Sequence, residues 1–167
     1  VSENQTAGLT PVVEQCDESV TCFEPRNEPG VCGGTSAFAL GEMKRFYETV
    51  KGVDPSLKVL GPGPVTIGPG SHGLGYLEDF LRSGGAAYID GLSFHAYNNL
   101  NGDLWLARKS MDGLVSLLGR YGVDQELWQT EQGAFAALYG AYQPRLQGRW
   151  TMLQMMVYEQ YGLPKER

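Results

Sequence analysis

The chain has 167 residues, of which 42% are hydrophobic, and it carries a formal net charge of −6 at pH 7. A chain of this length can bury a sizeable core, so residues 1–167 are treated as one domain or part of one. The acidic balance and the lack of a basic run argue against nucleic acid or an anionic membrane as partner. No apolar stretch approaches the ~20 residues of a membrane span.

Three cysteines, Cys16, Cys22 and Cys32, lie in the first fifth of the chain, at a spacing that fits no zinc ligand set. Cys22 is expected to be a buried thiol, and a disulfide between Cys16 and Cys32 stays open. The start at Val1 indicates either a removed leader or a sequence cut from a longer chain. The Asn4-Gln5-Thr6 sequon favours a secreted or extracellular protein.

Four short strands are expected in chain order, after a polar lead-in: residues 19–24, 58–61, 88–94 and 126–130. Helices with an apolar residue every three to four positions are expected over residues 35–50, 76–81, 103–121 and 144–161. Strand and helix thus alternate four times, in units near the ~30 residues of a βαβ repeat. This alternation predicts a parallel sheet covered by helices, which fits a doubly wound sheet or a (β/α)8 barrel.

The positions of the polar residues decide between these two folds. Asn27 and Glu28 follow the first expected strand, His95 and Tyr97 end the third, and Glu131 ends the fourth. Barrel enzymes build their active sites at the carboxyl ends of their strands. We therefore predict an α/β protein with a parallel (β/α)8 TIM-barrel fold, of which this chain supplies four β/α units.

Three segments resemble parts of a known group of enzymes. Residues 23–29 (FEPRNEP) are similar to the acid/base strand of the clan A glycoside hydrolases, which are retaining (β/α)8-barrel enzymes. Residues 92–97 (LSFHAY) resemble the sixth strand of that clan, and residues 127–133 (LWQTEQG) resemble the seventh. The xylosidase/iduronidase and cellulase families are nearest. The resemblance implies that the chain covers strands four to seven.

Carried over by position, the resemblance implies that Glu28 is the general acid/base and Glu131 the nucleophile. Asn27 would hydrogen-bond the 2-hydroxyl of the sugar. The two glutamates are about 100 residues apart with two strands between them, as the order of the clan requires. Arg26 stands where members commonly have a bulky apolar residue, and it would favour an acidic sugar.

The resemblance also places His95 or Tyr97 in the pocket, as a hydrogen-bond donor near Glu131. Strict alternation predicts that Gln129 points inward with Glu131 and that Trp128 packs under the helices. A metal site at His95 is not expected, because the chain has two histidines and no close set of carboxylates is evident around them.

Trp105 lies just past the third expected strand. It could form a sugar-stacking platform, or it could be buried in the first turn of a helix. Glu24 is expected to play a structural part and support the pocket.

The predicted function is hydrolysis of β-glycosidic bonds in an oligo- or polysaccharide, with net retention and without a metal or organic cofactor. The alternative is a catalytically inactive, carbohydrate-binding relative of the barrel. An aldolase-type chemistry is disfavoured, because Lys58 begins its strand and would face the wrong end of the barrel. Four strands alone leave two open edges, so a missing barrel half or a second copy is expected to complete the fold.

Overall fold

The computed structural model describes residues 8–16, 19–29, 35–64, 66–68, 71–97, 104–131 and 144–162. Within these residues, four strands form one sheet. The strands are β1 (Cys22–Phe23), β2 (Lys58–Pro62), β3 (Gly91–His95) and β4 (Glu126–Glu131). The helices are α2 (Leu9–Gln15), α3 (Ser36–Val53), α4 (His72–Arg82), the 3-10 helix η1 (Gly85–Tyr88), α5 (Leu104–Tyr121) and α6 (Pro144–Glu159).

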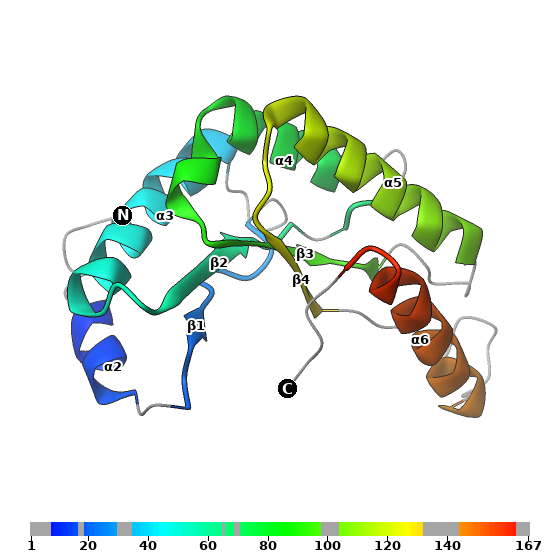
Figure 1. Cartoon of the computed structure of the whole chain (residues 1–167), viewed down its shortest axis with the longest axis horizontal. Coiled ribbons are helices and arrows are strands. Elements are labelled where there is room, and N and C mark those ends of the chain that lie inside the picture. The colour runs from blue at the N-terminus through cyan, green and yellow to red at the C-terminus, as the bar shows by residue number, and fades with distance from the viewer. Residues whose placement is uncertain are drawn as a thin grey trace.

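Neighbouring strands all pair in parallel, and their order across the sheet, β1-β2-β3-β4, is their order along the chain. The sheet is curled, and the helices form an arc along its outer side (Figure 1). A doubly wound sheet reverses its strand order at a switch point and carries helices on both faces. The described elements do neither. The α/β prediction is confirmed as a curled half-barrel of parallel strands.

An apolar core joins the outer face of the sheet to the helices. Val59 of β2 and both Leu92 and Phe94 of β3 are fully buried in it. The ring of Phe94 meets the ring of Tyr158 from α6 edge-on, with the centroids 6.5 Å apart. Ring pairs of this geometry add about 0.5–1.5 kcal/mol to the burial itself. This packing holds the strands rigid, so their carboxyl ends can position side chains accurately.

Most helix boundaries follow the sequence pattern. Thr35 caps α3 as expected, because its Oγ1 accepts the N–H of Phe38 at 3.2 Å. Helix α2 was not expected, since the residues before the first strand are mostly polar and Val13 is its one buried side chain. The strand predicted over residues 19–24 is shorter in the structure, where β1 contains only Cys22 and Phe23.

Two boundaries differ around the third strand. Helix α4 begins at His72, several residues before the expected start. Tyr88 was expected to open the strand, but it closes η1, and the strand β3 begins at Gly91. Gly84 precedes η1 with a left-handed φ of 85°, a conformation that glycine adopts without strain. The tight turn therefore displaces the start of the strand.

A register shift near the end of β4 reverses the alternation of its side chains. Ser93 pairs with Trp128 and Phe94 with Gln129, but His95 pairs with Glu131, which leaves Thr130 as the extra residue. Trp128 therefore shares the inner face with Ser93, while Leu127 packs on the apolar core. The alternation prediction for Trp128 is wrong, because it assumed an unbroken strand.

Cys16 and Cys22 are free, half-buried thiols, and Cys32 lies outside the described residues. Among the described helices, none combines the length and the apolar character needed to cross a membrane.

Candidate active site

Glu28 lies in the loop that follows β1. Its backbone φ is 46°, and among the residues that the structure describes it is the one non-glycine residue in the left-handed region. Holding a glutamate there costs about 1–3 kcal/mol. Such strain persists only where the surrounding contacts hold the residue, and residues of this kind gather at functional sites.

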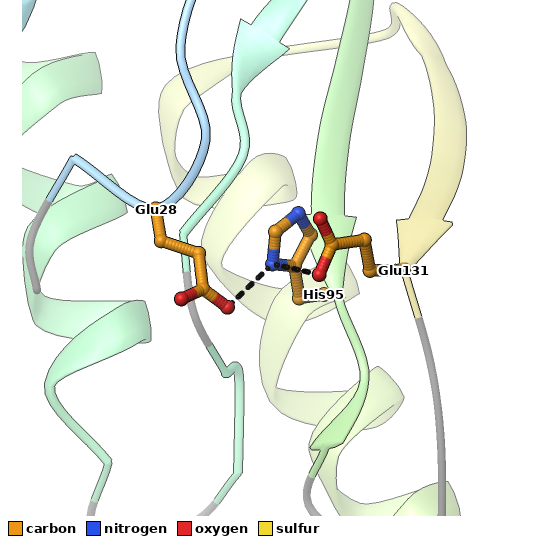
Figure 2. A group of neighbouring side chains, drawn as sticks. All are labelled: Glu28, His95 and Glu131. Carbon is orange, nitrogen blue, oxygen red and sulfur yellow. Dashed lines mark hydrogen bonds and ion pairs between the residues drawn. The ribbon is translucent and has the colours of Figure 1, made fainter.

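Three side chains from distant parts of the sequence meet at the carboxyl ends of the strands (Figure 2). His95 Nδ1 lies 3.0 Å from Oε1 of Glu28 and 3.6 Å from Oε2 of Glu131. One carboxylate oxygen of each glutamate lies within 4.8 Å of the other. The side chain of His95 is 1% exposed, whereas those of Glu28 and Glu131 are 21% and 36% exposed. A buried imidazole thus stands beside two partly exposed carboxylates.

Tyr97 supports one of these carboxylates. Its hydroxyl donates a hydrogen bond of 2.9 Å to Oε2 of Glu131. This hydrogen bond is the largest cause that raises the pKa of Tyr97, followed by partial burial and the negative charges of Glu131 and Glu28. The phenol therefore keeps its proton at neutral pH and acts as a fixed donor.

Backbone contacts hold the end of β3 against its neighbours. The N–H of His95 donates to the carbonyl of Pro64 at 3.2 Å, and the N–H of Ala96 donates to the carbonyl of Glu131 at 2.9 Å. Ala96 also pairs in the antiparallel sense with Thr66. The strand ends that carry His95 and Glu131 are thereby fixed relative to each other.

The expectation that no close set of carboxylates surrounds His95 is wrong. Glu28 and Glu131 do form a close set of carboxylates around this histidine, with one ligand atom of each residue within 4.8 Å of the others. Sequence could not reveal the set, because its three members come from three separate elements. A nitrogen and two carboxylate oxygens are a donor set that divalent transition metals accept.

The other predicted site residues, Asn27 and Trp105, are exposed. Asn27 is exposed, next to Glu28 in the same loop. Trp105, the second residue of α5, is 62% exposed rather than buried in its helix, and Lys109 Nζ lies 4.7 Å from the centre of its ring. Arg26 forms an ion pair of 2.9 Å with Glu42. Because this carboxylate balances its charge, Arg26 offers little support for an acidic sugar.

Glu24 lies between the ends of β2 and β4. Its Oε1 accepts a hydrogen bond of 3.5 Å from Oγ1 of Thr130. Gly63, which has a left-handed φ of 56°, leaves room for this carboxylate, because a Cβ there would lie 2.6 Å from the same oxygen. Glu24 thus contacts the strand that carries Glu131, through the residue just before it.

Lys58 lies at the opposite end of the sheet. It is the first residue of β2, and its Nζ pairs with Glu126, the first residue of β4, at 2.6 Å. An amine at the amino ends of the strands is remote from the cluster at their carboxyl ends. This position agrees with the sequence argument against a Schiff-base lysine here.

No protein-family model matches the sequence, and no curated protein matches it. Solved structures do match, and a glucosidase, a β-xylosidase and an exo-β-1,3-glucanase are among the proteins that share this fold.

Three structures illustrate the similarity. A glucosidase from Croceicoccus marinus is 18% identical with a TM-score of 0.69, over 87% of this chain and 33% of that chain. A GH39 β-xylosidase from Caulobacter crescentus is 17% identical with a TM-score of 0.61, over 92% and 34%. A GH128 exo-β-1,3-glucanase from Aureobasidium namibiae is 16% identical with a TM-score of 0.56, over 80% and 49%.

Identities this low establish similarity of fold. The expected resemblance to glycoside hydrolases is confirmed at that level, and it includes the xylosidase family that the sequence motifs suggested. The chain matches between one third and one half of the length of each of these three proteins.

Proposed function

We propose that this chain carries the catalytic residues of a retaining glycoside hydrolase that cleaves β-glycosidic bonds in oligo- or polysaccharides. Glu28 is the general acid/base and Glu131 is the nucleophile. One observation carries the proposal: carboxylates from the ends of the first and last strands converge on a single buried imidazole. Hydrolysis of a glycosidic bond needs two carboxyl groups facing each other across one site.

The distance between the carboxylates supports retention of configuration. Retaining enzymes hold the two groups ~5–5.5 Å apart, and inverting enzymes hold them ~6.5–9.5 Å apart to admit a water molecule. The approach of Glu28 and Glu131 oxygens to within 4.8 Å belongs with the shorter range.

The reaction proceeds in two displacements. Glu131 attacks the anomeric carbon while Glu28 gives its proton to the departing glycosidic oxygen, which forms a glycosyl ester on Glu131. Glu28 then removes a proton from water, and this water attacks the same carbon and releases Glu131. Asn27 holds the 2-hydroxyl of the sugar, an interaction that strengthens in the transition state.

His95 and Tyr97 give the two carboxylates different tasks. When Nδ1 of His95 carries a proton, it donates to Oε1 of Glu28, and Oε2 remains as the oxygen that exchanges a proton with substrate. The hydrogen bond from Tyr97 stabilises the negative charge of Glu131, which must be ionised to attack. Trp105, whose ring is exposed, provides a surface on which a sugar can stack.

A closed (β/α)8 barrel is part of this proposal. β1 and β4 are the edge strands of the described sheet, and open edges invite further pairing. Four additional strand–helix units, from further polypeptide or from a second copy, would pair with these edges and complete the carbohydrate-binding cleft. Measuring the mass of the active species in solution tells the two sources apart.

The test is turnover of 4-nitrophenyl β-glucoside and β-xyloside by the purified protein and its variants. Glu131→Ala should abolish release of nitrophenol, and added azide should restore part of it while forming a glycosyl azide. Glu126→Ala is the matched control, because it removes a carboxylate from the other end of the same strand. Its exposed ion pair with Lys58 contributes about 0–1 kcal/mol, so turnover should persist.

Unchanged turnover in Glu131→Ala would refute the assignment of the nucleophile. Binding of oligosaccharides without product release, followed by tryptophan fluorescence, would instead identify an inactive, carbohydrate-binding barrel.

A further inference from the structure

We propose that Glu28, His95 and Glu131 form a binding site for a divalent transition metal, with Zn²⁺ as the ion that fits best. The ligand atoms are Oε1 of Glu28, Nδ1 of His95 and Oε2 of Glu131. The metal is a regulator here and takes no part in turnover. Metal binding itself stands on the geometry alone, and the block of glycosidase turnover that follows from it rests on the proposed function.

The distances between the ligand atoms suit a small ion. Zinc binds nitrogen and carboxylate oxygen at ~2.0–2.2 Å, so tetrahedral ligands around it lie roughly 3.3–3.5 Å apart. Nδ1 of His95 is 3.0 Å from Oε1 of Glu28 and 3.6 Å from Oε2 of Glu131, which brackets that range. The two glutamate oxygens are within 4.8 Å of each other and would move closer together around an ion.

The surroundings of the three ligands favour coordination. The imidazole is 1% exposed, so its orientation is set by packing before any ion arrives. Tyr97 hydrogen-bonds Glu131, as outer-shell partners of ligand carboxylates commonly do. Two carboxylates and a neutral imidazole carry a charge of −2, which one Zn²⁺ neutralises. Three protein ligands leave the fourth position of the ion for water.

Metal binding and catalysis exclude each other. A bound ion requires Nδ1 of His95 and the carboxylates of Glu28 and Glu131 to be free of protons. The proposed reaction instead requires a proton on Glu28 and a free Glu131 to attack. Zn²⁺ therefore competes with substrate.

Zn²⁺ and Co²⁺ are the probes for the test. The chain contains two histidines, His72 and His95, so the ¹⁵N signals of each imidazole can be assigned and followed during a titration with ZnCl₂. We expect one ion per chain, a shift of Nδ1 of His95, and unchanged signals from His72, which is exposed at the start of α4. Co²⁺ should show visible absorption bands typical of tetrahedral coordination.

Variants then identify the ligands without disturbing the buried imidazole. Loss of an outer-shell partner already costs ~10–100-fold in metal affinity, and loss of a direct ligand should cost at least as much. Glu28→Gln and Glu131→Gln should therefore each raise the Kd for Zn²⁺ by roughly 100-fold or more. Glu126→Gln and His72→Gln are the matched controls and should leave the Kd unchanged. Folding of every variant is checked by circular dichroism.

The outcomes separate the two proposals. Zinc that shifts only His72, or that binds Glu28→Gln and Glu131→Gln as tightly as the parent chain, would overturn the metal site. Zinc bound at His95 without any glycosidase turnover, at any Zn²⁺ concentration, would support the site and refute the proposed function. Full turnover with the site filled would overturn the regulatory role.

Discussion

The hydroxyl of Tyr97 donates a hydrogen bond of 2.9 Å to Oε2 of Glu131, which lies 34 positions later in the chain. The two side chains come from neighbouring parallel strands, since Tyr97 follows the end of β3 and Glu131 ends β4. This bond both orients the carboxylate and ties the titration of the phenol to its charge.

We predict that Glu131→Gln lowers the pKa of Tyr97 toward its ordinary value of 10.0. The carboxylate raises this pKa by accepting the phenolic proton in a hydrogen bond and by repelling the phenolate, and a neutral amide removes the repulsion and weakens the bond. The pKa is measured from the ¹³Cζ signals of labelled tyrosines between pH 8 and pH 12.5.

Tyr161 provides the control for this titration. Its hydroxyl donates to Oδ1 of Asp112 at 2.7 Å, and its pKa is raised by partial burial and by that hydrogen bond. Tyr161 should titrate unchanged in Glu131→Gln. An unchanged pKa of Tyr97 in this variant would show that the hydrogen bond is not formed in solution.

We predict that Glu28→Ala slows cleavage of the glycosidic bond most for substrates whose leaving group needs a proton from a general acid. General acid catalysis contributes about 10²–10⁴-fold, so an alkyl β-glycoside should lose activity by that factor. A 2,4-dinitrophenyl β-glycoside leaves without a proton, and formation of its glycosyl-enzyme should slow by less than about tenfold. Pre-steady-state release of the phenol measures this step. Equal losses for both leaving groups would contradict the acid role of Glu28.

We predict opposite effects for two glycine substitutions in α4. A Cβ at Gly73 would lie 1.6 Å from the carbonyl oxygen of Thr66, which forms an isolated antiparallel bridge with Ala96 just after β3. Gly73→Ala must therefore displace the backbone at Thr66, which pairs with Ala96 after the end of β3. We expect a loss of roughly 2–4 kcal/mol in the free energy of unfolding.

The matched control is Gly75, two residues further along the same helix, where an added Cβ meets nothing within 4 Å. Gly75→Ala should raise the free energy of unfolding by about 0.5–1 kcal/mol, because alanine favours the helix. Urea denaturation measures both values. Equal effects of the two substitutions would contradict the close approach at Gly73.

We predict that Tyr158→Phe makes the protein more resistant to alkaline unfolding. Burial raises the pKa of Tyr158 to about 12, from 10.0. The raised pKa means that its contribution to stability is complete below pH 10.0 and is lost as the pH rises toward about 12. The loss amounts to about 2–3 kcal/mol, at 1.36 kcal/mol per pKa unit.

Phenylalanine has no phenolic proton to lose, so the free energy of unfolding of Tyr158→Phe should not show this loss at high pH. At neutral pH the variant should be more stable by about 1 kcal/mol, since the buried hydroxyl has no hydrogen-bond partner among the described residues. Urea denaturation at pH 8 and pH 11.5 measures both effects. Identical losses for the parent and Tyr158→Phe between these pH values would contradict the burial of the hydroxyl.

Much of the fold could be predicted from the sequence, because the information is local. Apolar residues every three to four positions predicted α3, α5 and α6. Strands were also predicted over residues 58–61 and 126–130, where the structure has β2 and β4. The same patterns placed Glu28 and Glu131 after strands. Helix α2 was not predicted, because only Val13 of this helix is buried and its sequence therefore shows no apolar stripe.

The sequence by itself determined the alternation of strands and helices and the presence of two glutamates at strand ends, because both depend on residues close together in the chain. Only the tertiary structure decided that Glu28 and Glu131 share one buried histidine, and that Trp128 lies on the inner face. The first depends on the curvature of the sheet, which brings the ends of β1 and β4 together. The second depends on a one-residue register shift against β3, and pairing between strands is not encoded in the pattern of either strand alone.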